Sequence, residues 1–192
     1  MWIVVGLGNP GARYAATRHN VGFRVLDALV ARHGAGAARA AHRALLWDSR
    51  VSGERVLLVK PQTFMNCSGG TLTSLRRFYE FATGKTIAVH DDVDLPLGRL
   101  RIRVGGGGGG HRGIASLVEA LGDPGFVRVK VGVGRPPAGE DTAQYVLAAP
   151  TEEDELCLAS AAARAAEAVE FIMSAGAESA MNRINQRETV NG

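Results

Sequence analysis

Polar side chains of catalytic types follow predicted strands at several places in this sequence. They are Asn9, His19, Asn66, Asp91 and His111. In an open α/β sheet, functional residues gather where strands end, so we expect these five to lie close together. A histidine beside a carboxylate and carboxamides can hydrolyse an ester or amide. The carboxylate fixes the imidazole tautomer, the imidazole takes a proton from water, and the carboxamides bind the oxyanion.

Each of these residues also has an ordinary structural interpretation. His19 suits a hydrogen-bonded loop, Asn66 suits a turn, and Asp91 or Asp94 suits the turn before Pro96. The glycine run at 105–110 and the alternating arginines at 99–103 are equally compatible with a flexible surface loop and a solvated strand face. Only the joint placement of the polar groups favours a hydrolytic site with water activated by His19.

Other chemistries fit the sequence less well. The glycines of GLGNPG match a dinucleotide-binding fingerprint, but Pro10 intervenes and the following helix starts nine residues too late to hold a pyrophosphate. A Walker-type phosphate loop is absent, and the five histidines lack metal-binding spacing. Cys67 and Ser68 stand outside a nucleophile elbow. We therefore expect no metal and no cofactor.

Alternating strand and helix patterns run through most of the chain. Strands are predicted at 2–5, 43–51, 55–60, 86–89, 99–104 and 126–133, and helices at 20–33, 68–81, 111–121, 151–176 and 177–186. Asn20, Ser68 and Thr151 are the predicted N-caps. The order predicts one α/β domain over residues 1–192, with a twisted, mixed but mainly parallel sheet flanked by helices.

The charge distribution points to an anionic partner. The net charge is +3, and residues 1–80 carry most of the positive charge while residues 151–192 are acidic. Nineteen of the 22 basic residues are arginine, whose planar guanidinium suits phosphate. A nucleic acid is therefore one candidate partner.

Several other classes are disfavoured. No apolar stretch is long enough to cross a bilayer, and the N-terminus lacks the pattern of a signal peptide. Cys67 and Cys157 are ninety residues apart and outside any metal or redox motif. We expect a cytoplasmic protein that does not bind membranes.

The sequence resembles the bacterial-type peptidyl-tRNA hydrolases over essentially its whole length. The resemblance lies in GLGNPGARYAATRHNVGF, KPQTFMNCSGG, HDDVDLPLGRLRIR, the glycine-rich turn into His111, and VKVGVGRPP. It implies a monomeric enzyme that hydrolyses the ester between a peptide and the 3′ end of tRNA. It also implies that no metal, cofactor or protein partner is required.

The resemblance assigns roles to particular residues. It implies that His19 is the catalytic base and that Asp91 orients it and stabilises its charge. Asn9 and Asn66 would position the peptide and the attacked carbonyl.

The resemblance also implies a tRNA-binding surface. Tyr14 and Phe64 would contact the substrate, and Arg103 with Lys130 would bind the 5′ phosphate of tRNA. One position departs from the family pattern, because Arg112 stands where an asparagine normally follows the histidine. We expect Arg112 to contact the substrate without a catalytic role. We also expect the six glycines at 105–110 to form a mobile loop that orders on substrate binding.

A relative that binds RNA without catalysis is the alternative from another class. The retention of His19, Asp91, Asn9 and Asn66 favours the enzyme.

Overall fold

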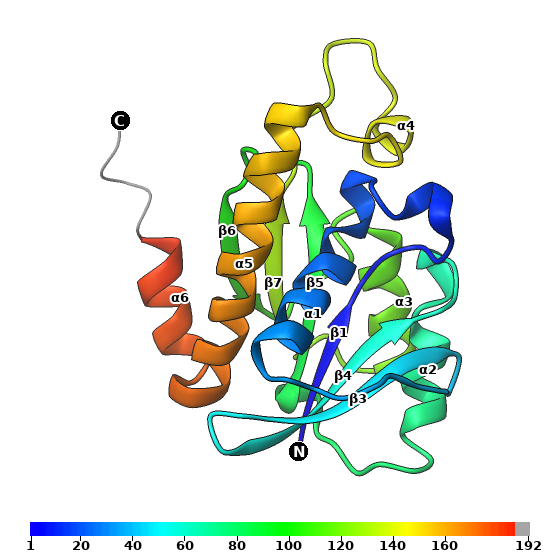
Figure 1. Ribbon diagram of the computed structural model, residues 1–192, viewed down its shortest axis with the longest axis vertical. Coiled ribbons are helices and arrows are strands. Elements are labelled where there is room, and N and C mark those ends of the chain that lie inside the picture. Colours follow the sequence, from blue (N-terminus) through cyan, green and yellow to red (C-terminus); the bar gives the residue numbers. More distant parts are fainter. Residues whose placement is uncertain (187–192) are drawn as a thin grey trace.

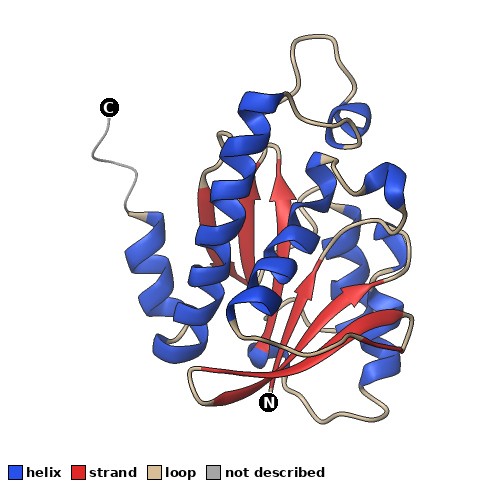
Figure 2. Ribbon diagram, viewed as in Figure 1, coloured by secondary structure: helices blue, strands red, loops and turns tan. Residues whose placement is uncertain are grey.

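The computed structural model describes residues 1–186, which form a seven-stranded mixed sheet flanked by helices (Figure 1, Figure 2). The order in the sheet is β2-β3-β4-β1-β5-β7-β6. The strands are β1 (Trp2–Gly6), β2 (Arg39–Ala41), β3 (Ala44–Val51), β4 (Glu54–Pro61), β5 (Thr86–Asp92), β6 (Leu100–Val104) and β7 (Val127–Gly132). The end of the predicted domain, residues 187–192, lies outside the described residues.

The centre of the sheet is parallel and its two sides are antiparallel. Strands β4, β1, β5 and β7 pair in parallel, whereas β2, β3 and β4 on one side and β6 and β7 on the other pair antiparallel. Every residue of β1 is buried, as expected for a central strand covered on both faces. The predicted fold class is confirmed.

Helices cover both faces of the sheet (Figure 1). Helices α1 and α5 pack on one face, and α2 and α3 on the other. The helices are α1 (Val21–Arg32), α2 (Gly69–Leu75), α3 (Arg112–Leu121), α4 (Thr142–Val146), α5 (Glu152–Ala175) and α6 (Ala177–Asn185). Short 3₁₀ turns are η1 (Ala12–Tyr14), η2 (Arg18–Asn20), η3 (Met65–Cys67) and η4 (Thr83–Lys85). Within residues 1–186, no helix combines the length and apolar character needed to cross a bilayer.

Two glycines allow the close packing that positions the site. A Cβ at Gly22 would lie 2.4 Å from the carbonyl oxygen of Val89 and 2.5 Å from that of Leu7. The first turn of α1 therefore lies directly on the strand ends, and the preceding turn η2 sits beside the end of β5. A Cβ at Gly69 would lie 2.0 Å from the carbonyl oxygen of Ser116, so α2 packs directly on α3, whose first turn borders the site.

The helix predicted at 68–81 is shorter than expected. Helix α2 ends at Leu75, and the N–H groups of Arg77 and Phe78 bond three residues back, to Ser74 and Leu75. Leu75 is fully buried, but Phe78 is 71% exposed and stacks on His42 instead. The residues after Leu75 still reach the core, because Tyr79 and Phe81 pack against it from outside the helix.

All three predicted N-cap residues directly precede their helices, but two of them make no capping hydrogen bond with their side chains. The side chain of Asn20 bonds to the backbone N–H and C=O of Asn9 rather than capping α1. The hydroxyl of Ser68 donates to the carbonyl of Met65. Thr151 does cap α5, accepting a hydrogen bond from the Asp154 N–H. The long-range need to tie two loops together outweighed local capping at Asn20.

Two short elements were not predicted from the sequence. Strand β2 extends the hairpin by three residues, and α4 lies between the predicted strand at 126–133 and the predicted helix at 151–176. Both are too short to show a clear periodicity. The other predicted strands and helices are present, within a few residues at their ends.

Candidate active site

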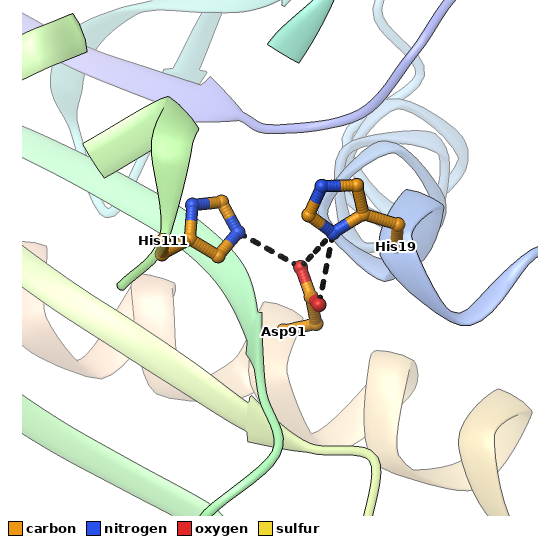
Figure 3. Close-up of side chains that lie close together, drawn as sticks. All are labelled: His19, Asp91 and His111. Atoms are coloured by element: carbon orange, nitrogen blue, oxygen red, sulfur yellow. Dashed lines mark hydrogen bonds and ion pairs between the residues drawn. The ribbon is translucent and has the colours of Figure 1, made fainter. Parts of the chain in front are cut away.

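His19 and Asp91 meet where η2 lies against the end of β5 (Figure 3). The Nδ1 atom of His19 is 2.9 Å from both carboxylate oxygens of Asp91. The Asp91 side chain is 3% exposed and the His19 side chain 14%. The expected proximity of these two residues is confirmed. With Nδ1–H donating to the carboxylate, Nε2 of His19 carries the lone pair of a base.

A second histidine binds the same carboxylate. Nε2 of His111, the residue before α3, lies 2.9 Å from Oδ1 of Asp91 (Figure 3). Nδ1 of His111 accepts a hydrogen bond from the N–H of Ile114 and so caps α3. Because Nδ1 is an acceptor, Nε2 carries the proton and donates to Asp91. The sequence placed His111 among the five clustered groups but gave it no separate role.

The two histidines keep Asp91 ionised. Burial on its own would raise the pKa of Asp91, but His111, followed by His19, lowers it well below its usual range. A buried carboxylate without such donors would take up a proton instead. Asp91 therefore remains a carboxylate at neutral and mildly acidic pH.

His90 is a buried neutral neighbour of this group. Its Nδ1 donates to the backbone carbonyl of Asp91, and its ring packs edge-on to His111 with centroids 4.7 Å apart. Burial, then repulsion from His111, lowers the pKa of His90 to about 3. His90 thus adds no positive charge beside the two histidines that bind Asp91.

Asn9 joins the first loop to the loop that carries Asn66. Its Oδ1 accepts a hydrogen bond from the N–H of Met65, and its backbone is held by Asn20. Because Oδ1 accepts this bond, the other end of the carboxamide is Nδ2. The Nδ2 group is then the donor that Asn9 can offer to the cleft. The side chain of Asn66 is exposed and makes no hydrogen bond to the described residues.

These groups line one cleft of about 850 Å³. That volume is in the range of sites that hold a large organic ligand. The lining includes Asn9, His19, Phe64, Asn66, Asp91 and His111, together with basic residues and part of α4. Phe64 is 57% exposed there, so its ring is accessible to a ligand in the cleft.

Three arginine and lysine residues of the cleft come from the β6–β7 face, and a fourth, Arg112, comes from α3. Register places Arg103 opposite Arg128, and Arg101 opposite Lys130, so the sequence pair Arg103 and Lys130 lies on the same face but not directly opposite. Lys130 forms an ion pair with Asp92 at 2.7 Å. Arg103 is exposed and has no carboxylate partner among the described residues. The freer cation of the predicted pair is therefore Arg103.

Arg128, on β7, is a buried arginine. It is 3% exposed, its guanidinium packs on the ring of Phe126, and it donates to the carbonyls of Gly106 and Gly107. Burial, then the charge of Arg103, lowers its pKa. Arg128 thus ties one part of the glycine-rich loop to the sheet.

Arg112 begins α3 at the edge of the cleft. Its side chain is exposed, lines the cleft, and makes no hydrogen bond or ion pair to residues 1–186. Tyr14 stands apart, outside the lining of the cleft, and its ring packs beneath the guanidinium of Arg13 at 4.5 Å. The structure thus brings all predicted site residues except Tyr14 into one cleft.

His19, Asp91 and His111 are also the group in residues 1–186 that could hold a metal ion, with one ligand atom from each within 4.8 Å of the others. The imidazole nitrogens lie 2.9 Å from the carboxylate oxygens, which is hydrogen-bonding distance. Ligands about 2.1 Å from one tetrahedral ion lie farther apart than this. The geometry as it stands is that of a hydrogen-bonded triad.

A mixed α/β sheet with an imidazole, a carboxylate bonded to it and carboxamides at the rim of a cleft is an arrangement expected of a hydrolase. The model of the family "Peptidyl-tRNA hydrolase" matches residues 3–191. The chain belongs to this family.

Individual relatives agree along their whole length. The peptidyl-tRNA hydrolase of Chloroflexus aggregans is 45% identical over 186 residues, covering 96% of this chain and 99% of the relative. That of Rubrobacter xylanophilus is 49% identical over 183 residues, covering 95% and 99%. The crystal structure of peptidyl-tRNA hydrolase from Acinetobacter baumannii matches with a TM-score of 0.89 at 31% identity, covering 97% of this chain and 95% of that one.

Proposed function

We propose that this chain, a member of the peptidyl-tRNA hydrolase family, hydrolyses its substrate with a water molecule activated by His19. The substrate is the ester that joins the carboxyl end of a peptide to the ribose at the 3′ end of tRNA. The observation that carries the proposal is the contact of His19 Nδ1 with both oxygens of the buried Asp91, at 2.9 Å, in the wall of the cleft.

His19 acts as base and then as acid. Its Nε2 takes a proton from water as the water oxygen bonds to the ester carbonyl carbon. The ester C–O bond then breaks, and the same proton passes to the ribose oxygen of the departing tRNA. Asp91 stabilises the imidazolium between these steps, and because its pKa lies well below the usual range it keeps its charge throughout.

His111 holds Asp91 in place. It donates to Oδ1 from a tautomer fixed by the Ile114 N–H, so the carboxylate cannot rotate away from His19 without losing this bond. We propose that His111 is a positioning residue for the base, acting through Asp91.

Asn9 and Asn66 supply donors for the oxyanion. The Asn9 carboxamide is oriented by its bond from the Met65 N–H, and Asn66 follows directly from Met65 on η3. One such donor is typically worth about 10²–10³-fold in rate. This pair would bind the carbonyl oxygen as its negative charge develops.

The remaining cleft residues bind the two ends of the substrate. Arg103 and Arg112, whose guanidinium groups have no ion-pair partner among residues 1–186, offer them to phosphates, with Lys130 in the same cleft. Phe64 offers an apolar surface. Tyr14 would contact tRNA outside the cleft, where its ring and the guanidinium of Arg13 form an exposed edge.

We also propose that residues 1–192 act as one domain, as a monomer in the cytoplasm, without a required protein partner. The free thiols Cys67 and Cys157 suit a reducing compartment, and the substrate arises where translation takes place.

The test is release of labelled N-acetylated amino acid from tRNA by the wild type and by His19→Ala. We expect kcat to fall by about 10³-fold while binding of uncharged tRNA changes little. Wild-type protein that binds tRNA but releases nothing would support an RNA-binding relative without catalysis. A His19→Ala variant with full activity would contradict the role of His19.

A further inference from the structure

Arg18 is a buried arginine whose side chain is not used by the site described above. It precedes His19 in η2, and its side chain is 7% exposed. Its Nη1 donates to the carbonyl of Ala149 at 3.2 Å, and its Nη2 to Asp154 at 3.1 Å. Weaker bonds at 3.5 Å reach the carbonyls of Tyr145 and Ala148. A buried guanidinium is retained only where such partners compensate for its lost hydration, so these contacts join two distant segments firmly.

The segment that Arg18 binds is one wall of the cleft. Residues of α4 and its flanks, Asp141, Thr142, Ala143, Val146 and Leu147, line the cleft, and we call residues 141–147 the α4 wall. Most of this segment is exposed to solvent, apart from Tyr145 and Val146. In Figure 1 α4 lies at the end of a long connection between β7 and α5, above η2. A short helix on such a connection depends on a few anchoring contacts for its position.

Tyr145 is the second anchor and meets Arg18 directly. The guanidinium carbon of Arg18 lies 4.3 Å from the centroid of the Tyr145 ring, a cation–π contact. The Tyr145 hydroxyl donates to the carbonyl of Val133 at 2.7 Å, just after β7. The wall is therefore fixed to β7 through Tyr145, and to the loop of His19 through Arg18.

The wall lies away from the most basic part of the cleft. Tyr145 is anchored at Val133, whereas Arg128 lies five residues earlier in the chain, on β7, and Arg103 is its partner on β6. At about 3.3 Å per residue that is a separation of roughly 16 Å. Three of the five wall residues that line the cleft are apolar, Ala143, Val146 and Leu147, and Leu147 is 42% exposed. An apolar surface at this end suits the acyl part of a substrate whose phosphates bind at the other end.

We propose that Arg18 is a positioning residue that holds the α4 wall at a set distance from His19, and that this wall contacts the acyl part of the substrate. The inference deepens the proposed function, because it assigns a binding role within the same cleft. Arg18 does not touch the hydrogen bonds among His19, Asp91 and His111. Its loss should therefore weaken substrate binding more than the chemical step.

The first experiment compares Arg18→Ala with wild type on two substrates. One is a tRNA carrying a single N-acetylated alanine, and the other is the same tRNA carrying an N-acetylated apolar tetrapeptide. We expect KM to rise about tenfold for the tetrapeptide ester, the size of a lost charge-assisted contact, and about twofold for the short ester. We expect kcat to stay within about twofold of wild type for both.

Arg24→Ala is the matched control. Arg24 also joins the first loop to α5, through Glu155 at 2.6 Å and the carbonyl of Ala16 at 2.9 Å, but it makes no contact with the α4 wall. We expect its KM values to match those of wild type. Arg18→Lys keeps the charge but cannot reach Ala149 and Asp154 at once, so it should show an intermediate KM for the tetrapeptide ester.

Amide hydrogen exchange, measured without substrate, tests the wall directly. Exchange over residues 142–149 should be at least tenfold faster in Arg18→Ala than in wild type, with β1 and β5 unchanged. Should Arg18→Ala fail to fold, Arg18→Lys and Tyr145→Phe carry the same comparison, because Tyr145→Phe removes only the bond to Val133.

Three outcomes would overturn the proposal. They are an equal rise in KM for both esters, a fall in kcat with unchanged KM, and unchanged exchange in the wall. His19→Ala is assayed in parallel. Full activity in that variant would contradict the role of His19 alone, because hydrogen exchange in Arg18→Ala reports on the wall independently of catalysis.

Discussion

The two halves of the cleft differ in whether their charged side chains have partners within the protein. On the catalytic side, His19 and His111 both hydrogen-bond to Asp91 at 2.9 Å, and the carboxylate is 3% exposed. On the basic side, Arg103 and Arg112 are exposed and have no carboxylate partner within residues 1–186. The first half is organised before substrate arrives, as acid–base chemistry requires. The second half presents charges that a polyanion can pair with, as affinity for a nucleic acid requires.

The largest effect should come from breaking the organised half at Asp91. In Asp91→Asn the amide donates to His19 Nδ1 and leaves the proton on Nε2, so the base is lost. We expect kcat to fall by about 10²–10⁴-fold with little change in KM. Steady-state kinetics at neutral pH measure this. Asp94→Asn is the control, because Asp94 is exposed and pairs only with Arg135 among the described residues. Near-normal kcat in Asp91→Asn would remove the carboxylate from the mechanism.

A smaller effect is expected at Arg103, in KM rather than kcat. Arg103→Ala should raise KM about fivefold at low salt and reduce the slope of log KM against log salt by about one, for one lost phosphate contact. Lys130→Ala should do less, because Asp92 already pairs with Lys130 at 2.7 Å. Arg101→Ala serves as the control on the same strand, since Arg101 is exposed outside the cleft lining. An unchanged salt slope in Arg103→Ala would contradict the phosphate contact.

Arg112 departs from the family pattern, and Arg112→Asn tests whether it contributes to substrate binding rather than to catalysis. Loss of an exposed guanidinium should raise KM about threefold at low salt, and the difference should vanish at high salt where such contacts are screened. A rise or fall of kcat larger than tenfold would instead place Arg112 with the catalytic groups. Single-turnover measurements separate the two outcomes.

The last prediction concerns stability rather than catalysis, and it tests the lowered pKa of His90. Its pKa of about 3 in the folded protein lies below the value of 6.5 for an unperturbed histidine. The unfolded chain therefore binds a proton first as pH falls, and stability is lost progressively from pH 6.5 towards 3. In His90→Asn, which can still donate to the Asp91 carbonyl, this part of the loss should disappear. Urea unfolding at pH 7 and pH 4 measures it, and the part of the loss that comes from Asp91 is common to both proteins and cancels in the comparison. The same loss in both proteins would contradict the assignment.

Most of the fold follows from local patterns. The fully apolar run of β1 and the alternation in β6 mark strands that the structure contains. The acidic first turn of α5 behind Thr151 marks a helix that begins as expected. Errors arose where tertiary contacts outweighed a local preference. Asn20 has the residue type of an N-cap but serves to bind Asn9, and α2 ends at Leu75 although Tyr79 and Phe81 beyond it still pack against the core.

The sequence predicted which residues belong to the site but not which of them contact one another. Residue types at strand ends, and the motifs around them, point to His19, Asp91, Asn9 and Asn66. Pairing across the sheet is not readable in the same way. The sequence does not reveal that Lys130 is neutralised by Asp92, or that Arg128 turns inward to the glycine loop. Such contacts depend on register and on loop paths, which nearby residues do not encode.

The sequence by itself determined the order of strands and helices, the polar groups at the strand ends and the excess of arginine, because each depends on residue type and short-range periodicity. Only the tertiary structure decided that two histidines share one carboxylate, and that the arginine before the base reaches a wall more than a hundred residues away. Those contacts form when the packing of α1 and α3 on the sheet brings distant loops within hydrogen-bonding distance. Burial then makes their geometry strict, because an unpaired charge inside the protein is too costly to keep.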